Sequence, residues 1–263
     1  MSVVSVEHVD KEYKLGKQRV PALTDVSLDV QEREFLAIAG PSGSGKSTLL
    51  NLIGCIDTPT RGAVYIRGQD VSQRSPDQLA DLRLHHIGFI FQTFNLLPVL
   101  SAWENVEYPL LHRKDLDRRR RRALTHHYLN VVGLRKFAHH RPNELSGGQR
   151  QRVAIARALA IQPSIVLADE PTANLDHKTG EHLIALMKHI NRVEKTTFIF
   201  ATHDSTVMAM VNRVVRLRDG KIVSSEVVTR KAPNPLGDDT IHRVRPFLET
   251  GGGATRVRSS EEG

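Results

Sequence analysis

The sequence predicts an α/β fold, in which a parallel sheet is covered by helices and carries an inserted α-helical subdomain. Short apolar segments typical of strands alternate with segments of helical spacing along most of the chain. Between residues 101 and 160 the spacing is helical throughout, which indicates the insertion. The chain has 263 residues, 40% of them hydrophobic and 25% charged, as expected for a folded domain with a sizeable core.

Residues 1–91 contain several strand-like segments and one helix. Apolar and polar residues alternate in the first two segments, as in half-buried strands, whereas the third is a nearly continuous apolar run. A glycine-rich turn follows the third segment, and a helix is expected to begin there. The expected elements are strands at 3–9, 26–30, 34–39, 62–67 and 87–91, with a helix at 47–56.

The rest of the chain combines helices and strands. Residues 165–168 are apolar without alternation, which favours a strand at the buried centre of a parallel sheet. The further elements expected are a helix at 181–193, a strand at 196–201, and a hairpin of 214–217 with 222–223 around Asp219-Gly220. In the helical segment, the side chains expected to face inward are Leu110, Leu111, Leu124, Leu129 and Val132.

These patterns predict one main domain over residues 3–226, with the helical subdomain over about 93–160. A tail at 227–263, rich in proline, glycine and polar residues, is expected to be loosely ordered. No apolar run reaches the ~18 residues of a membrane-spanning helix. The N-terminus lacks the pattern of a secretion signal, so we expect the protein to stay in the cytoplasm.

Composition narrows the function only a little. Cys55 is the one cysteine, which excludes an intrachain disulfide and favours a buried, inert thiol. The formal net charge is +8, and residues 118–122 are five consecutive arginines. We interpret this run as a solvated helix face in preference to a site for lipid headgroups or nucleic acid.

Residues 40–48 carry the strongest chemical signal. They match the phosphate-binding pattern G-x-x-x-x-G-K-[ST] between an expected strand and an expected helix. The glycines let backbone N–H groups turn toward phosphate oxygens, and the helix adds its positive N-terminal end. Lys46 can reach the terminal phosphates of ATP, and Ser47 offers a hydroxyl to Mg²⁺. The predicted nucleotide-binding residues are Gly40, Pro41, Ser42, Gly43, Ser44, Gly45, Lys46, Ser47 and Thr48.

Two acidic residues follow the apolar strand at 165–168. Ligands of α/β sheets lie at the carboxyl ends of strands, where Asp169 and Glu170 are expected to emerge. Asp169 is predicted to hold Mg²⁺, and Glu170 to act as the general base on the attacking water.

Residues 145–149, Leu-Ser-Gly-Gly-Gln, form a second anion-binding turn before a helix. One ATP needs only one phosphate cradle, so a second one in the same chain requires another explanation. With this sequence, LSGGQ, the chain resembles the ABC ATPase family. In that family the turn faces the phosphate loop of the opposite subunit, so that two ATP molecules lie between two domains. The resemblance therefore adds Ser146, Gly147, Gly148 and Gln149 to the nucleotide-binding residues.

The resemblance covers residues 3–226 and implies roles for further residues. Tyr13 matches the aromatic residue that stacks on adenine, and Gln92 the glutamine that touches Mg²⁺ and senses the membrane partner. Residues 173–176 match the loop that communicates across the dimer. His203 matches the switch histidine that contacts the γ-phosphate and orients the water.

Two positions depart from the family pattern. Arg33 stands in a turn before the phosphate loop where the family usually has glycine, so we expect this turn to differ. Asn174 replaces a commoner small residue of the cross-dimer loop. Neither departure removes a predicted catalytic group.

The resemblance implies an ATP-hydrolysing transporter subunit that works as a dimer, with a homodimer as the simplest arrangement. A separate integral-membrane permease would hold it at the cytoplasmic face of the membrane. Residues 40–54, 88–98, 104–106 and 109–111 are similar to the branch with lipoprotein-releasing and macrolide- or peptide-exporting ATPases. The alternatives are a soluble ABC protein acting on DNA or ribosomes and a small-molecule kinase. Against them stand the single phosphate loop, the missing heptads and the LSGGQ turn, so no nucleic-acid partner is expected.

Overall fold

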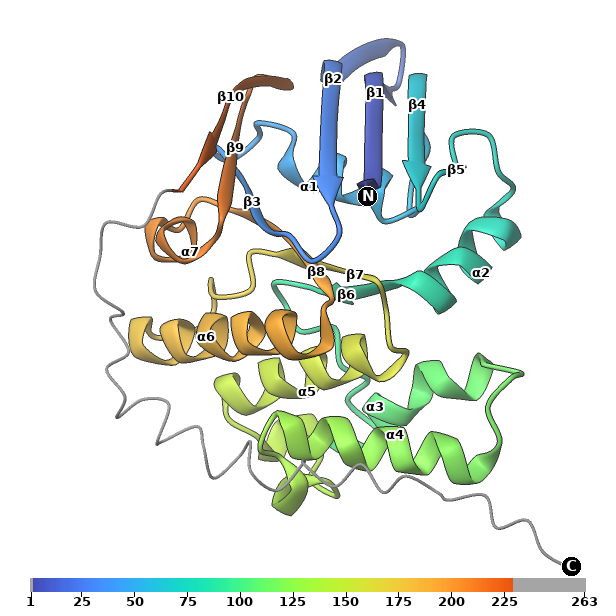
Figure 1. The fold of residues 1–263 in the computed structure, drawn as a ribbon, viewed down its shortest axis with the longest axis vertical. Helices are drawn as coiled ribbons and strands as arrows, with labels where there is room; N and C mark the ends of the chain where they lie inside the picture. The colour runs from blue at the N-terminus through green and yellow to red at the C-terminus, as the bar shows by residue number, and fades with distance from the viewer. Residues whose placement is uncertain (1, 229–263) are drawn as a thin grey trace, which may run out of the picture.

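The computed structural model describes residues 2–228, which form two sheets with helices around them (Figure 1). The six-stranded sheet has the order β10-β9-β3-β8-β7-β6, and the four-stranded sheet the order β2-β1-β4-β5. The strands are β1 Ser2–Leu15, β2 Gln18–Gln31, β3 Phe35–Ala39, β4 Arg61–Ile66, β5 Gln69–Asp70, β6 Ile87–Ile90, β7 Ile165–Asp169, β8 Thr197–Thr202, β9 Arg213–Arg218 and β10 Lys221–Val227.

The larger sheet is parallel except for β10, which pairs antiparallel with β9. Both of its faces are buried. Along β3, Phe35, Ala37 and Ala39 pack toward the side of α5 and α6, and the side chains between them pack toward α1 and the smaller sheet. Burial on both faces explains why residues 165–168 are apolar without alternation.

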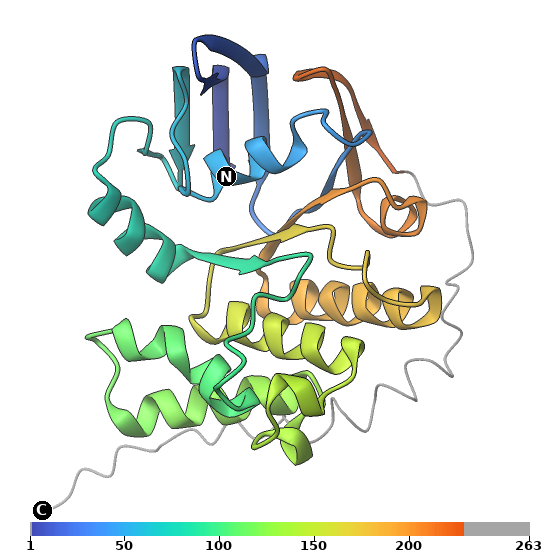
Figure 2. The same cartoon turned by 180° about the vertical axis from the view of Figure 1, so that it is seen from behind.

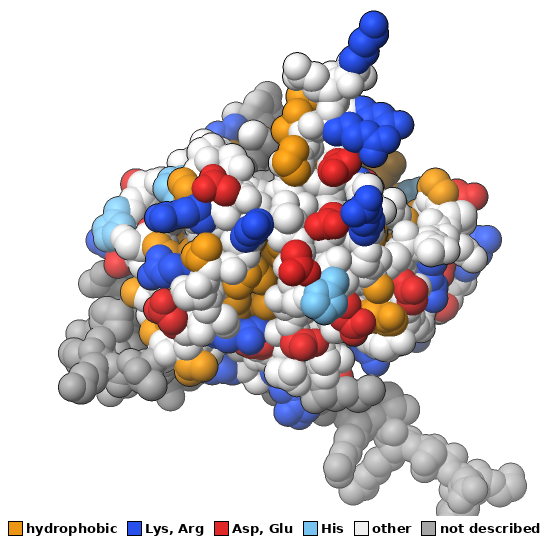
Figure 3. All heavy atoms as spheres, turned by 90° about the horizontal axis from the view of Figure 1, so that it is seen from above, with side chains coloured by type: hydrophobic (Ala, Val, Ile, Leu, Met, Phe, Trp, Pro, Cys, Tyr) orange, Lys and Arg blue, Asp and Glu red, His pale blue; other side chains and the backbone are white. Residues whose placement is uncertain are grey.

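The four-stranded sheet is antiparallel and covers α1 (Figure 2). Seen from above, Lys and Arg side chains on this end of the molecule are interspersed with Asp and Glu side chains (Figure 3). On this face the surplus of basic residues does not gather into a single patch.

Helices cover the larger sheet and build the inserted subdomain, which lies below the sheet in Figure 1. Short polar side chains start most of them. Ser101 and Ser146 each form a capping box with a residue three positions later, and Asp117 and Asp176 each accept a backbone N–H bond. The helices are α1 Lys46–Ile53, α2 Pro76–His86, α3 Ala102–Glu107, η1 Tyr108–His112, α4 Arg118–Val131, η2 Arg135–Phe137, η3 Pro142–Glu144, α5 Gly147–Ala160, α6 His177–Glu194 and α7 Ser205–Met210.

Most elements expected from the sequence are confirmed, with shifted ends. The first strand is longer than predicted and runs to Leu15 because it pairs with β2 along its whole length. Helices α2 and α7 were not predicted. In α2 the Ser75-Pro76 start and its capping box were the signal that could have revealed it. The hairpin around Asp219-Gly220 is confirmed, and both residues have the positive φ angles of a tight hairpin turn.

Predicted burial holds with one exception. Leu110, Leu124, Leu129 and Val132 are buried, but Leu111 is 56% exposed, so its predicted inward position is wrong. Leu111 lies in a 3₁₀ turn, where the expected α-helical spacing no longer applies.

Three further expectations concern single features. Cys55 is buried, and burial raises the pKa of its thiol to about 11, as expected for an inert cysteine. Within residues 2–228, no helix is both long and apolar enough to cross a membrane. The predicted tail lies outside the described residues from 229 onward.

Arg33 adopts a backbone conformation that favours glycine. Its φ of 64° is in the left-handed region that favours glycine, and its backbone N–H donates to the Thr197 hydroxyl at 2.9 Å. Its carbonyl accepts from the buried Asn191 amide at 3.0 Å. These two bonds hold an arginine in a left-handed conformation.

Candidate active site

The candidate site lies where neighbouring parallel strands end at the same edge of the larger sheet. Strand β3 leads into the phosphate loop, β6 toward Gln92, β7 into Asp169-Glu170 and β8 into His203. The side chains that these strands deliver surround a cavity of about 380 Å³. The cavity is lined by Ala22, Ser42, Gly43, Gly45, Lys46, Ser47, Thr48, Gln92, Asp169, Glu170 and His203.

The phosphate loop has the geometry of an anion cradle. Gly43 and Gly45 have φ angles of 78° and 101°, and a Cβ on Gly45 would lie 2.6 Å from the Ala22 carbonyl oxygen. Lys46 Nζ donates to the carbonyls of Gly40 and Pro41, both at 2.9 Å, and so lies along the loop. The buried Ser44 hydroxyl has no hydrogen-bond partner among the described residues. A cation, loop N–H groups and a helix N-terminus are the groups that bind a triphosphate.

Oxygen atoms that could coordinate a divalent cation lie close together beside this loop. The Ser47 hydroxyl donates to Asp169 Oδ1 at 3.2 Å, and Gln92 lines the same cavity. Burial raises the pKa of Asp169, and the charge of Glu170 adds to the rise, while the Ser47 hydroxyl and Lys46 oppose it. A hydroxyl, an amide oxygen and a carboxylate fit Mg²⁺, which is bound by few protein ligands together with substrate phosphates.

Glu170 is held on both of its carboxylate oxygens by residues at the end of β8. His203 Nδ1 lies 2.7 Å from Oε1, and the Thr202 hydroxyl donates to Oε2 at 3.1 Å. Because a carboxylate only accepts, Nδ1 carries the hydrogen in this contact, and Nε2 is left to face another group. The side chain of Glu170 is largely buried, whereas that of His203 is 70% exposed. The carboxylate of Glu170 is therefore held in the protein interior, and the imidazole of His203 faces the solvent side of the cavity.

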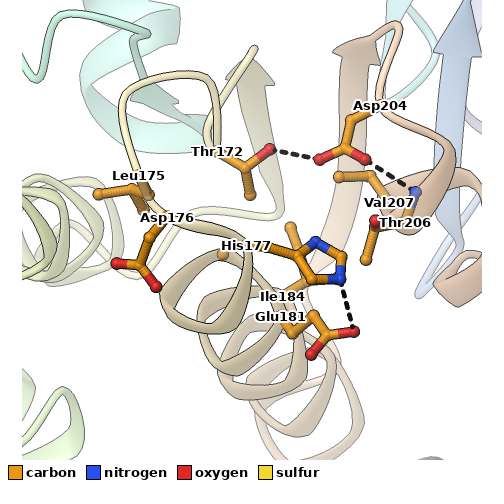
Figure 4. Close-up of a pocket in the computed structure, with 10 residues that line it drawn as sticks. Thr172, Leu175, Asp176, His177, Glu181, Ile184, Asp204, Thr206 and Val207 are labelled. Carbon is orange, nitrogen blue, oxygen red and sulfur yellow. Dashed lines mark hydrogen bonds and ion pairs between the residues drawn. The ribbon is translucent and has the colours of Figure 1, made fainter.

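Further hydrogen bonds, centred on Asp204, connect the segment after β8 to the segment after β7. The Thr172 hydroxyl donates to Asp204 Oδ2 at 3.0 Å, and the Thr206 N–H donates to Oδ1 at 2.8 Å (Figure 4). Burial raises the pKa of Asp204, but these hydrogen bonds outweigh it and hold the pKa below its ordinary value. These bonds thus connect the segments that follow β7 and β8, next to Glu170 and His203.

Some predicted nucleotide-binding residues lie outside the cavity. Tyr13 is on β1, where its hydroxyl donates to Asp57 Oδ2 at 3.1 Å and its side chain interacts with that of Thr48. Lys11 is buried and donates to Asp57 Oδ1 at 2.6 Å, so an ion pair fixes the acceptor of Tyr13.

The LSGGQ turn also lies outside this cavity. Ser146 begins α5, and its hydroxyl accepts from the Gln149 N–H at 3.3 Å. Gly147 lies against Asn174 and Leu175, and Gly148 against Thr179, all in the cross-dimer loop or the first turn of α6. The turn does not line the cavity at the phosphate loop of its own chain.

Several residues at the site were not found from the sequence. Ala22 lines the cavity from β2, and Thr202 and Asp204 orient the groups around Glu170. Thr202 and Asp204 flank His203 directly, so the run Thr-His-Asp was the available signal. Ala22 gave none, because only the packing of the two sheets brings it to the site.

Comparison with known proteins shows what this chain is similar to. Residues 23–173 match the family described as ABC transporter. An ABC transporter ATP-binding protein of Methanocaldococcus jannaschii, MJ0796, is 47% identical over 229 residues, which cover 85% of this chain and 97% of that protein. The macrolide export ATP-binding/permease protein MacB of Bradyrhizobium diazoefficiens is 46% identical over 224 residues, which cover 85% of this chain but 34% of MacB. A solved structure of MJ0796, a dimer in a post-hydrolysis state bound to ADP and Pi, superposes with a TM-score of 0.80 at 46% identity over 86% of this chain and 99% of that one.

Proposed function

This chain belongs to the ABC transporter family, as its motifs predicted, and from that premise we propose that two copies close head to tail around two Mg-ATP and drive a separate membrane permease. The chain is an ATP-binding and ATP-hydrolysing cassette of that family. The head-to-tail homodimer, the roles of the individual residues and the permease are the proposed part.

One observation carries the dimer proposal. The cavity is lined by the phosphate loop, Asp169, Glu170 and His203. The LSGGQ turn of the same chain lies outside this cavity, and its Ser146 side chain is exposed. A helix N-terminus with bare glycine N–H groups is an anion-binding element without an anion partner in its own chain. A second copy supplies that partner if its phosphate loop faces Ser146.

The reaction follows from the groups around the cavity. Water attacks the γ-phosphorus, the bond from that phosphorus to the bridging oxygen of ADP breaks, and Glu170 accepts the proton of the water. His203 holds one oxygen of Glu170 and presents its other ring nitrogen toward the γ-phosphate. Lys46 binds the terminal phosphates. Ser47, Asp169 and Gln92 would hold Mg²⁺, which neutralises phosphate charge when it is bound.

The permease is proposed to dock on the helical subdomain and the end of β6. Leu97, Val99, Tyr108 and Leu111 are large apolar side chains with 39–74% of their surface exposed. A groove of about 230 Å³ beside them is lined by Phe89, Phe91, Pro109 and Ile161, among other residues. An apolar groove with exposed apolar residues at its rim suits a short amphipathic helix of a partner.

We propose export or extraction of a lipoprotein, macrolide or peptide-like molecule as the work of the complex. The similarity to the macrolide exporter MacB supports export. The permease would then hold the chain at the cytoplasmic face of the membrane. MacB carries its permease in the same chain, and the region similar to the present chain is 34% of its length.

Glu170→Gln tests the core of this proposal. The amide keeps the shape of the side chain but is a poor base, so ATP binding should persist while turnover stops. The variant should then accumulate as a dimer with ATP and Mg²⁺, as measured by light scattering after size-exclusion chromatography. Glu181→Gln, the same change on α6 away from the site, should behave as the wild type. Hydrolysis by Glu170→Gln at the wild-type rate would remove Glu170 from the role of base, and a strictly monomeric ATP-bound form would overturn the dimer.

A further inference from the structure

The loop that carries Gln92 has an unfavourable backbone conformation. Phe94 and Asn95 have φ angles of 63° and 48°, two consecutive left-handed residues of which neither is glycine. Such a pair persists only where surrounding groups hold it in place. The loop makes two backbone bonds of its own, from the Phe94 N–H to the Phe91 carbonyl and from the Asn95 N–H to the Thr93 carbonyl. Its remaining carbonyls point toward other segments.

Arg157 on α5 binds two of these carbonyls. Its Nη2 donates to the Phe94 carbonyl at 2.9 Å, and its Nη1 to the Asn95 carbonyl at 2.5 Å. Burial lowers the pKa of this guanidinium, and no carboxylate is paired with it among the described residues. A second arginine of the same helix, Arg150, lies over the Phe94 ring, 5.3 Å from its centre. Two arginines of α5 therefore hold the strained residues Phe94 and Asn95 in place.

The cross-dimer loop holds the other end of the same segment. Asn174 Nδ2 donates to the Gln92 carbonyl at 2.8 Å. This contact gives the departure at position 174 a structural meaning, since a smaller residue has no amide to reach across. The Gln92 loop is thus fastened to α5 at residues 94 and 95 and to the cross-dimer loop at residue 92.

We propose that Arg157 is a positioning residue that makes the placement of Gln92 depend on α5, the helix that begins with the LSGGQ turn. This inference rests on the proposed role of Gln92 at Mg²⁺ and on the proposed dimer. Ser146 and Arg157 stand on one rigid helix, about 16 Å apart along its axis. A shift of the turn when it meets the partner's ATP therefore moves the guanidinium, the two carbonyls and Gln92 together. Arg157 links the ATP bound by one subunit to the metal site of the other.

Arginine suits this role better than lysine. Its planar fork donates to two carbonyls at once in a fixed geometry, whereas a lysine ammonium acts as a single point on a flexible stem. Arg157→Lys should accordingly restore part of what Arg157→Met loses.

The same helix supplies a matched control. Arg152 is also partly buried, and its Nη1 donates to the Val132 carbonyl at 3.1 Å, within the helical subdomain and away from Gln92. Arg152→Met removes a similar contact from α5 without touching the Gln92 loop. Any general loss from weakening this helix should appear in both methionine variants.

The test is steady-state ATP hydrolysis by the full chain at varied ATP and Mg²⁺, with thermal melting of each variant. Arg157→Met should lower kcat between about 10-fold and about 100-fold, as small misplacements at active sites do. It should also raise the Mg²⁺ concentration needed for half-maximal rate and leave the KM for ATP within about threefold. Arg152→Met should keep kcat and the Mg²⁺ dependence, and Arg157→Lys should fall between Arg157→Met and the wild type.

A double variant separates this inference from the function on which it rests. In a Gln92→Ala background, Arg157→Met should cause no further loss, because the group that it positions is gone. Independent, multiplying effects of the two changes would overturn the positioning role, and so would an unchanged Mg²⁺ dependence in Arg157→Met. If Gln92→Ala itself hydrolyses ATP normally, the proposed role of Gln92 fails instead.

Discussion

Glu170 adopts a left-handed backbone conformation, with a φ of 45°, at the end of a buried parallel strand. Its N–H donates to the Ala201 carbonyl at 2.9 Å, and this bond stabilises the turn. The turn directs the carboxylate toward Thr202 and His203, where both of its oxygens are engaged. The strained backbone of this one residue orients the carboxylate that we propose as the general base.

Thr202→Val tests how much the orientation of the Glu170 carboxylate depends on a single hydroxyl. The hydroxyl donates to Glu170 Oε2 and accepts from the Asp204 N–H, and valine keeps the shape without either bond. We expect kcat to fall about 10-fold, part of the 10²–10⁴-fold that a general base contributes, with KM little changed. Thr125→Val is the control, because its equally buried hydroxyl donates to a backbone carbonyl of α4, far from the site. If both variants keep the wild-type kcat, the hydroxyl of Thr202 does not position Glu170.

Asp169 offers a prediction about pH and stability. Its pKa in the folded protein is raised, chiefly by burial, so folding favours the protonated form. The stability that protonation confers is present at low pH and is lost as the pH rises through the folded pKa. Without metal and nucleotide, Asp169→Asn should therefore melt at a higher temperature than the wild type at pH 7.5. The difference should shrink toward pH 4, and Mg²⁺-dependent hydrolysis should be lost.

The measurement is thermal unfolding of both proteins in EDTA over that pH range. A lower melting temperature for Asp169→Asn at pH 7.5 would mean that the hydrogen bond from Ser47 outweighs the cost of the buried charge. In that case the carboxylate stabilises the empty site instead of destabilising it.

At the scale of elements, strand ends could be predicted and contacts between distant segments could not. Residues 40–48 and 169–170 follow buried strands, and a short pattern marks each of them, so the sequence placed them at one edge of the sheet. The contacts of Arg157 with residues 94–95 and of Asn174 with Gln92 join positions more than 60 residues apart. No local sequence pattern predicts these contacts. They arise only when the insertion packs against the sheet.

The exposed face of the helical subdomain shows the same limit. Helical spacing correctly predicted the burial of four of the five leucine and valine side chains. The prediction failed at Leu111, where the chain forms a 3₁₀ turn. Phe94, Leu96 and Leu97 follow Gln92 in the sequence, and no local pattern decides whether they face the core or a partner. Leu96 packs against the core, whereas Leu97 is 39% exposed.

Leu97→Glu tests whether this face couples ATP closure to a permease. The side chain lies at the surface, so a charge there should not disturb folding, and basal hydrolysis by the isolated chain should stay within about twofold of the wild type. Binding to the permease, its effect on the hydrolysis rate, and transport should all be lost, because a glutamate would be buried in an apolar interface. Val193→Glu, at a 63% exposed position at the end of α6, is the matched control. Unaltered transport by Leu97→Glu would exclude this part of the face from coupling.

At the scale of the whole molecule, we propose that the chain carries two half-sites at separate places in its structure. The phosphate loop, the acidic pair and His203 belong to one half, and the LSGGQ turn to the other. Contacts within the chain join the halves, since Gly147 packs against Asn174 and Asn174 binds the Gln92 carbonyl. In the proposed dimer, such a chain would contact both ATP molecules.

Complementation between two inactive variants tests this arrangement. Lys46→Ala removes the cation beside the triphosphate, and Ser146→Arg blocks the turn with a bulky charge, so each variant alone should be inactive. In a mixed dimer, the intact Lys46 of one subunit faces the intact Ser146 of the other, and one of the two sites is complete. Random mixing in equal amounts should recover up to about a quarter of the wild-type rate, because about half of the dimers are mixed and each has one working site.

The control for this experiment separates blocking of the site from damage to the helix. Ser146 caps α5 through a capping box, so arginine there also costs about 1 kcal/mol of helix stability. Ser101→Arg breaks the equivalent capping box of α3, away from the proposed interface, and should keep its activity. If Ser101→Arg is active while the mixture of Lys46→Ala and Ser146→Arg stays inactive at every ratio, the two half-sites do not meet across a dimer. Recovery in the mixture, absent from either variant alone, can come only from a site built by two chains.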